Sequence, residues 1–284
     1  MRTPTFYIDQ YLTHIGLKND KREPSLDFLT EIITHHLRTF YYQNTKIFFE
    51  VKKPLEQRIE ASIAVDDLFQ QMIINKTPGY CLQNMELLRA ALIQLRFKTH
   101  RFLSKVIYVP FDQLETVNVK QLYFSHAMLY ITLEDRAYMV DTGFGNGSLR
   151  GPLEFRAGEQ AIQEDIYRLV PLGENNWRLD SKVPQKNDWL CLYQFSQIPV
   201  NEEQIRETNR NLFFAGPIPI QAKLLITKVT GEKRKTFVFF SETSTGIFKS
   251  LRHDGTVKRE TRFTSLEEAI PLIEEKFNVK LPGK

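Results

Sequence analysis

The chain has 284 residues, of which 42% are hydrophobic and 25% charged, and its formal net charge is +4 at neutral pH. This composition is typical of a folded globular protein, and the length fits two domains, three small ones or one large one. The mild positive charge suits an anionic ligand such as a phosphorylated cofactor. The basic residues are dispersed and form no zinc-finger or ribonucleoprotein pattern, so we expect no nucleic-acid partner.

Cysteine content and hydropathy limit the kind of protein further. The two cysteines, Cys81 and Cys191, are too few for a disulfide framework or a structural zinc site. Asp9 and Gln10 interrupt the apolar residues of the N-terminal stretch, which therefore does not resemble a signal peptide. No apolar run reaches the roughly 18 residues that a membrane-spanning helix needs. We expect a cytoplasmic protein with no metal and no membrane association.

The first part of the chain is predicted to be helical. Pro24 precedes Ser25, a favourable N-cap, and apolar residues follow at three- and four-residue spacing. A second helix is predicted to follow Cys81, because apolar residues recur there with the same period. The two predicted apolar faces are formed by Leu26, Leu29, Ile33, Leu37 and Phe40, and by Met85, Leu88, Leu92 and Leu95.

From about Lys105 the apolar pattern changes to a period of two, which predicts strands. These strands cover residues 106–110, 126–133, 136–140, 222–229 and 236–240. The basic run at residues 233–235 lies between the last two strands and is interpreted as a solvent-exposed turn.

The C-terminal part is predicted to contain a hairpin and a helix. Residues 246–263 form the hairpin, with its turn at Asp254-Gly255. The helix is predicted to begin near Thr264, with Glu267 completing a capping box, and to be bent or divided at Pro271.

The order of these elements predicts an α+β fold rather than an alternating doubly wound one. We expect three domains. Residues 1–85 form a helical N-terminal domain with Cys81, residues 86–205 form a β-rich central domain, and residues 206–284 form an α/β C-terminal lid domain.

Cys81 is a candidate nucleophile because of its position. Residues 77–80 (Thr-Pro-Gly-Tyr) break the chain, and a helical pattern begins directly afterwards. The free N–H groups and the dipole at a helix N-terminus favour the thiolate, which is the nucleophilic form. The alternative is a buried structural cysteine, since most cysteines are small core residues.

His126 and Asp141 are candidates for the base and for the group that orients it. His126 opens one predicted strand, and the returning strand ends at Asp141. If Glu134 and Asp135 form a two-residue loop, Asp141 lies opposite Met128, on the face that also carries His126. A loop one residue longer or shorter would reverse the faces, so the pairing depends on this loop.

At these residues the chain resembles the arylamine N-acetyltransferase family. Motifs of the family occur in the same order along nearly the whole chain. The similar segments are residues 11–16 (Tyr-Leu-Thr-His-Ile-Gly), 79–81 (Gly-Tyr-Cys), 125–127 (Ser-His-Ala), 140–145 (Val-Asp-Thr-Gly-Phe-Gly), 192–195 (Leu-Tyr-Gln-Phe) and 275–281 (Glu-Lys-Phe-Asn-Val-Lys-Leu).

The resemblance implies a catalytic triad of Cys81, His126 and Asp141, in a core related to that of cysteine proteases and transglutaminases. It implies ping-pong transfer of an acetyl group from acetyl-coenzyme A (CoA), through an acetyl-cysteine thioester, to an arylamine, a hydrazine or an arylhydroxylamine. Phe144 would line the acceptor pocket, or would simply be a core residue at the end of the hairpin. No residue that contacts CoA can be mapped.

The chain departs from the family pattern near the nucleophile. Thr77-Pro78 replaces Arg-Gly, Gln83 replaces Glu, and Met85 replaces Asn, although Asn84 is adjacent. Residues 41–44 read Tyr-Tyr-Gln-Asn in place of Pro-Phe-Glu-Asn. If the lost arginine and a lost carboxylate pair in the family, a buried ion pair has been removed as a unit, which proteins tolerate. Tyr42 adds a hydroxyl to the pocket and is expected to change acceptor preference.

These departures leave other functions open, because fold and function are separable. One is an amide synthase with a carrier-bound acyl donor. Another is a cysteine amidase or protease that uses water as acceptor. The last is a non-catalytic ligand-binding relative.

Overall fold

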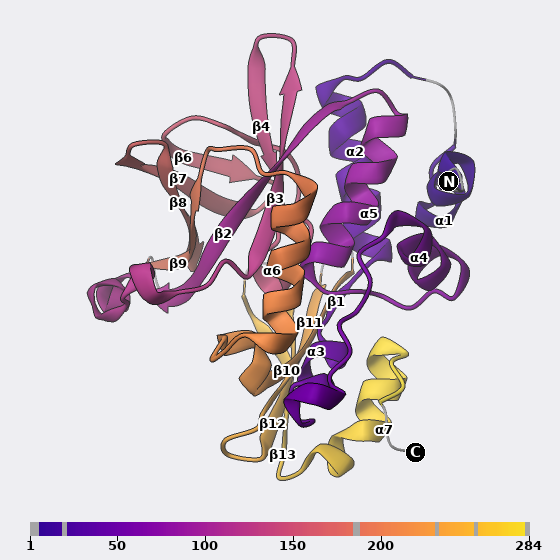
Figure 1. Cartoon of the computed structure of the whole chain (residues 1–284), viewed down its shortest axis with the longest axis vertical. Helices are drawn as coiled ribbons and strands as arrows, with labels where there is room; N and C mark the ends of the chain where they lie inside the picture. Colours follow the sequence, from indigo (N-terminus) through magenta and orange to yellow (C-terminus); the bar gives the residue numbers. More distant parts are fainter. Residues whose placement is uncertain (1–5, 19–21, 184–187, 231–232, 253–254, 282–284) are drawn as a thin grey trace.

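Helices occupy the N-terminal part of the chain and strands most of the remainder, as Figure 1 shows for the computed structural model. The structure describes residues 6–18, 22–183, 188–230, 233–252 and 255–281. The strands of this part of the chain form two antiparallel sheets. The α+β fold class predicted from the sequence is confirmed.

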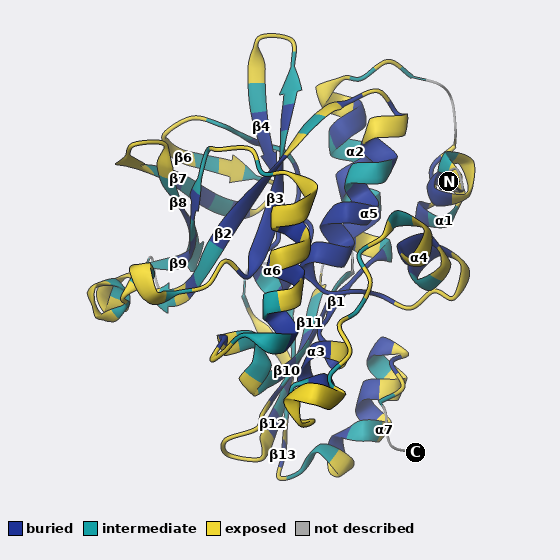
Figure 2. Ribbon diagram, viewed as in Figure 1, coloured by how far each residue is buried: buried dark blue, intermediate teal, exposed yellow. Residues whose placement is uncertain are grey.

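Five α-helices lie in the described N-terminal part of the chain, and α1 and α4 pack against α5. The five are α1 (Ile8–Ile15), α2 (Leu26–Thr39), α3 (Thr45–Glu50), α4 (Val65–Leu68) and α5 (Cys81–Gln94). Ser25 caps α2 as predicted, because its hydroxyl accepts a hydrogen bond from the Phe28 backbone N–H at 3.2 Å. The predicted apolar residues of α5 are buried, and its first half is buried on all sides (Figure 2). A helix enclosed in this way holds its first residue in a fixed position.

The larger sheet has the order β5-β4-β3-β2-β9-β8-β7-β6. Its strands are β2 (Lys98–Pro110), β3 (His126–Leu133), β4 (Arg136–Val140), β5 (Leu153–Glu154), β6 (Gly158–Ile162), β7 (Asp165–Gly173), β8 (Asn176–Val183) and β9 (Asp188–Ser196). The sequence predicted β3 and β4 with their bounds, but only the end of β2 and none of β5–β9. Shifts of register in β7–β9 interrupt the period of two on which the prediction depended.

The smaller sheet has the order β1-β10-β11-β12-β13. Its strands are β1 (Tyr42–Gln43), β10 (Lys223–Thr230), β11 (Lys233–Phe240), β12 (Thr245–Arg252) and β13 (Val257–Phe263). Helix α6 (Glu202–Phe214) precedes it and α7 (Leu266–Phe277) follows it. The predicted hairpin corresponds to β12 and β13; Asp254 of its predicted turn lies outside the described residues.

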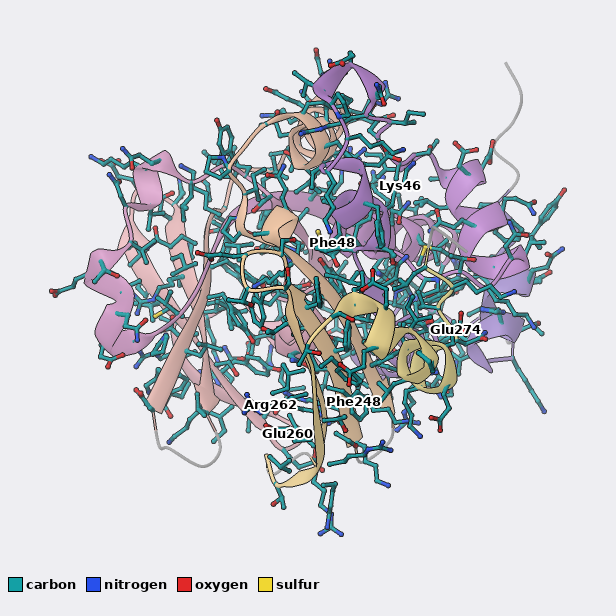
Figure 3. The ribbon with its side chains drawn as sticks, turned by 90° about the horizontal axis from the view of Figure 1, so that it is seen from below. Lys46, Phe48, Phe248, Glu260, Arg262 and Glu274 are labelled. Atoms are coloured by element: carbon teal, nitrogen blue, oxygen red, sulfur yellow. The ribbon has the colours of Figure 1, made fainter. Side chains whose placement is uncertain are left out.

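Two helices cover this sheet, and Figure 3 labels a residue at each contact. Phe48 of α3 meets Phe239 edge to face, with ring centroids 6.2 Å apart. Phe248 of β12 meets Phe277 of α7 in the same way at 6.1 Å. Thus α3, from the N-terminal part of the chain, belongs to the core of the C-terminal sheet. This packing of α3 holds the adjacent strand β1 beside β10.

Residues 233–235 do not form the predicted exposed turn. They begin β11, and half-buried Arg234 forms an ion pair with Asp165 of β7 in the other sheet. Arg234 also donates a hydrogen bond to the Asn146 carbonyl at 3.1 Å. The prediction was wrong because the carboxylate that neutralises Arg234 comes from a distant part of the chain.

The start of α7 differs by one residue from the prediction. Ser265, rather than Thr264, is the N-cap and accepts a hydrogen bond from the Glu268 backbone N–H at 3.2 Å. Thr264 instead donates its hydroxyl to the Glu268 carboxylate. Pro271 lies inside α7, which continues undivided to Phe277.

The buried residues form three clusters, one around α5, one in the larger sheet and one between the smaller sheet and α7. The domain boundaries at residues 85 and 205 stay a prediction. Both positions lie inside helices, α5 and α6.

Candidate active site

Cys81 is the first residue of α5, as predicted, and its side chain is buried beside the end of the larger sheet. Its sulfur lies 3.7 Å from the carbonyl oxygen of Ser125, the residue before β3. Gly143 packs against its backbone so closely that a Cβ there would lie 2.8 Å from both Cys81 Cα and Cys81 O. Residue 143 must therefore be glycine for the loop after β4 to reach the start of α5.

His126 and Asp141 meet as the hairpin geometry predicted. Leu133 pairs with Arg136, so Glu134 and Asp135 form the two-residue loop. His126 Nε2 lies 2.8 Å from Asp141 Oδ2, and both side chains are almost completely buried. The Asp141 carboxylate is held by two more donors, the Gly143 backbone N–H at 3.0 Å and the Tyr193 hydroxyl at 2.8 Å.

The protonation of His126 depends on its two neighbours. Burial by itself lowers the pKa of the imidazole, because a charged ring loses hydration. The Asp141 charge and hydrogen bond, followed by the interaction with Cys81, outweigh burial and raise the pKa to about 10. Because Nε2 faces Asp141, Nδ1 is the ring nitrogen left for the sulfur. The raised pKa keeps the imidazole protonated at neutral pH.

A cavity of about 320 Å³ opens onto Cys81 and His126. Phe144 lines it and also packs edge to face on His126, with ring centroids 4.9 Å apart, and on Tyr193 at 5.0 Å. Phe144 therefore combines the two roles that the sequence left open, pocket wall and partner of the core. The lining of the cavity also includes aliphatic residues such as Ile218, Leu225 and Val238.

Tyr42 also lines this cavity. It is buried in β1, which pairs with β10 of the C-terminal sheet. Burial and the nearby charges of Cys81 and Tyr80 raise the pKa of its phenol well above the usual value, so the hydroxyl stays protonated. The structure thus brings the two predicted pocket residues, Phe144 and Tyr42, to one cavity with Cys81.

Amide side chains, Gln43 and Gln83, occupy two of the positions where the chain departs from the family motif, and Asn84 lies next to a third. The Gln43 side chain donates a hydrogen bond to the Pro78 carbonyl at 2.6 Å and accepts one from the Thr45 backbone N–H at 2.8 Å. The Gln83 amide donates to the Ser62 carbonyl at 3.0 Å, and the Asn84 amide to the Gly79 carbonyl at 2.8 Å. Neutral side chains therefore fix the segment before Cys81 without a buried charge.

Sequence reasoning missed three residues of this site. Tyr193 was noted only within a motif, although it holds Asp141. Tyr108 and Lys223 line the cavity and received no role. Tyr193 reaches Asp141 because β9 lies beside β2, which pairs with β3. No local pattern in the sequence shows that strand order.

The residues that the structure describes hold neither a metal-ligand cluster nor a membrane-spanning helix. Among them, no group of three or more His, Cys, Asp or Glu side chains is arranged to hold a metal ion. None of the helices in this part of the chain combines the length and the hydropathy needed to cross a bilayer.

Comparison with known proteins identifies the family. A sequence profile described as N-acetyltransferase matches residues 25–284. Arylamine N-acetyltransferase 2 of Mesocricetus auratus is 28% identical over 222 residues, which are 72% of this chain and 71% of that protein.

Solved structures share the fold. A C70Q arylamine N-acetyltransferase of Mycobacterium smegmatis superposes with a TM-score of 0.79 at 22% identity, covering 97% of this chain and 93% of the other. The Mycobacterium marinum arylamine N-acetyltransferase in complex with CoA gives a TM-score of 0.77 at 19% identity, with 96% and 93% covered. The chain belongs to the arylamine N-acetyltransferase family.

Proposed function

We propose that this protein transfers an acetyl group from acetyl-CoA to an arylamine, an arylhydrazine or an arylhydroxylamine through an acetylated Cys81. The observation that carries the proposal is the buried contact of His126 with Asp141 at 2.8 Å, beside a cysteine at a helix N-terminus. Family membership supports the acyl transfer, and the CoA complex of the M. marinum relative supports the donor.

In the first half of the reaction, the Cys81 thiolate attacks the thioester carbonyl carbon of acetyl-CoA. The bond between that carbon and the CoA sulfur breaks, and the departing thiolate takes the proton from His126. The acetyl group is then bound to Cys81 as a thioester. Neutral His126 remains, still oriented by Asp141, whose carboxylate fixes the ring tautomer.

In the second half, the nitrogen of the acceptor attacks the acetyl carbon on Cys81, and His126 accepts the proton that the nitrogen loses. The bond to sulfur breaks, and the thiolate–imidazolium pair is restored. Proton and charge are thus conserved over the cycle. Phe144 and Tyr42 would contact the acceptor, because they line the cavity that reaches both Cys81 and His126.

Steady-state kinetics test this proposal. With acetyl-CoA and 4-aminobenzoate as the two varied substrates, double-reciprocal plots should give parallel lines, as a covalent intermediate requires. Cys81→Ser should abolish transfer, whereas Cys191→Ser, at the other buried cysteine, should retain it. Intersecting lines would contradict the ping-pong scheme. Turnover with water alone would instead identify a hydrolase, and activity with carrier-bound acyl groups only would identify an amide synthase.

We also propose the division into domains at residues 1–85, 86–205 and 206–284, with the last acting as a lid. The buried cluster of the larger sheet, whose members all lie between Phe102 and Phe195, supports the central domain. A cytoplasmic location remains a prediction from the sequence.

A further inference from the structure

The catalytic cavity contains a positive charge that the mechanism does not use. Lys223, the first residue of β10, lines the cavity together with Cys81 and His126. In the part of the chain that the structure describes, no Asp or Glu lines this cavity. The ammonium of Lys223 forms no ion pair or hydrogen bond with the described residues, and it lies 5.8 Å from the centre of the Tyr108 ring.

Partial burial of the Lys223 ammonium carries a desolvation cost. The Lys223 side chain is half-buried, and desolvation lowers the pKa of its ammonium, with no carboxylate nearby to oppose the shift. The ammonium has therefore given up part of its hydration without gaining an anionic partner in the protein. An anionic group on a bound ligand would supply that partner.

The backbone around Lys223 is well fixed. Its carbonyl accepts a hydrogen bond from the Asn44 amide at 2.8 Å, and Lys223 pairs with Phe240 at the end of β11. Tyr108, which faces Lys223, has a φ of +50° and lies where β2 and β9 shift register between Val106 and Val109. Such a bulge with a left-handed non-glycine residue redirects a side chain, and these features gather at functional sites.

A continuous aromatic wall leads from Lys223 to the catalytic pair. Tyr108 contacts Phe144 with ring centroids 6.0 Å apart, and Phe144 contacts His126 at 4.9 Å. Tyr108 is also 42% exposed, which places this end of the wall near the opening of the cavity. Cys81, Tyr108 and Lys223 line the same cavity, so Tyr108 and Lys223 border the space open to the far end of an acceptor whose nitrogen faces Cys81.

We propose that Lys223 binds a negatively charged group on the acceptor, so that the preferred acceptors are arylamines or arylhydrazines that carry a carboxylate. This inference rests on the proposed function. The cavity of about 320 Å³ is at the small end of the roughly 300–1,000 Å³ range of ligand pockets. It suits one substituted ring, whereas the nucleotide part of CoA would have to lie outside it. The phosphates of the donor are the competing source of anionic oxygens.

The test compares two acceptors that differ in charge, 4-aminobenzoate and its methyl ester. The donor is S-acetyl-N-acetylcysteamine, a thioester without phosphate groups. In Lys223→Met the ratio of kcat/KM for acid over ester should fall by roughly 10- to 100-fold relative to wild type, the value of a lost charged hydrogen bond. Lys223→Arg should largely restore the ratio. The ratio does not depend on the fraction of folded enzyme.

Lys228→Met is the matched control, because Lys228 lies on the same strand, is also partly desolvated, and contacts Tyr41 outside the cavity. It should keep the wild-type ratio. An unchanged ratio in Lys223→Met would overturn the inference. If the ratio is unchanged and the KM for acetyl-CoA rises while the KM for the phosphate-free donor does not, Lys223 binds the phosphates of the donor, and the inference about the acceptor is overturned.

The proposed function is checked separately in the same samples. Suppose that the wild-type enzyme becomes acetylated at Cys81 and either amine removes the acetyl group, but that Lys223→Met leaves the acid-to-ester ratio unchanged. That result contradicts only the role of Lys223 and leaves the proposed function intact. A wild-type enzyme that never acetylates Cys81 contradicts the proposed function, and this inference with it.

Discussion

Tyr193 donates its hydroxyl, at 2.8 Å, to the same Asp141 oxygen that faces His126 Nε2. His126 is therefore oriented by a carboxylate whose own position depends on β9, two strands away in the sheet from β3. The ring of Tyr193 also lies 5.3 Å from that of His126, so one residue both holds the carboxylate and packs against the imidazole.

Removing this hydroxyl should loosen Asp141. We expect Tyr193→Phe to reduce kcat/KM about 3- to 10-fold and the free energy of unfolding by ~1.5–3 kcal/mol, since a hydrogen bond to a charged group is lost. Tyr167→Phe is the control: Tyr167 is equally buried and donates to the Ser148 carbonyl. It should lose stability but keep kcat/KM. Equal losses of activity in the two variants would show that Tyr193 has a structural role only.

Asp141 should be essential for transfer. Asp141→Asn keeps the shape of the side chain but removes the charge that stabilises protonated His126 and fixes its tautomer. By comparison with the same replacement in a Ser-His-Asp triad, we expect kcat to fall by about 10³- to 10⁴-fold. The variant should remain folded by circular dichroism. A loss of less than tenfold would exclude Asp141 from the catalytic apparatus.

The raised pKa of His126 also predicts how stability depends on pH. Its ordinary value is 6.5 and its value in the folded protein is about 10. The folded state therefore holds the proton more tightly, and its contribution to stability is fully present below pH 6.5 and lost as pH rises to about 10. Urea unfolding of wild type and His126→Gln between pH 6 and pH 10 measures this contribution. The difference between the two proteins should shrink as pH rises. A constant or growing difference would contradict the raised pKa.

Gly143 should not tolerate a side chain. A Cβ at this position would lie 2.8 Å from the Cys81 backbone, which cannot move freely because α5 is buried. We expect Gly143→Ala to cost ~1–3 kcal/mol of stability, in the range of overpacked cores, and to reduce acetylation of Cys81 at least tenfold. In Gly246→Ala, a Cβ would lie 3.3 Å from ring atoms of Phe237 and Phe239, and neither of these rings lines the cavity at Cys81. That control should retain its activity per folded molecule; equal loss of activity would contradict the account.

Variants at Gln43, Thr77 and Pro78 test whether the chain has lost a buried ion pair of the family as a unit. Gln43→Glu replaces a donor with a carboxylate facing the Pro78 carbonyl oxygen, and should cost ~2–4 kcal/mol of stability. Adding Thr77→Arg and Pro78→Gly returns the motif residues of the family and should recover most of that loss. Chemical denaturation of the single, double and triple variants measures the coupling. If the losses simply add, residues 43 and 77 do not form a pair.

Local pattern accounts for part of what the sequence predicted, whereas the grouping of Cys81 with His126 and Asp141 depended on the family resemblance. The chain break before Cys81 and the two-residue loop between β3 and β4 place three side chains without knowledge of the rest of the fold. The features that the sequence did not predict depend on residues far away in the chain or on a choice between neighbouring residues. Asp165 turns Arg234 from an exposed cation into an internal ion pair. The shift of the α7 cap from Thr264 to Ser265 is a choice between adjacent hydroxyls that the sequence alone does not decide.

The most direct test of the mechanism is the intact mass of the protein after mixing with acetyl-CoA in the absence of an acceptor. The account predicts one acetyl group per chain, absent in Cys81→Ser and removed when an arylamine or hydrazine is added. An unmodified protein whose Cys81 is nevertheless alkylated rapidly by iodoacetamide would contradict acetyl-CoA as the donor, and an acetyl group that persists in Cys81→Ser would contradict Cys81 as the nucleophile.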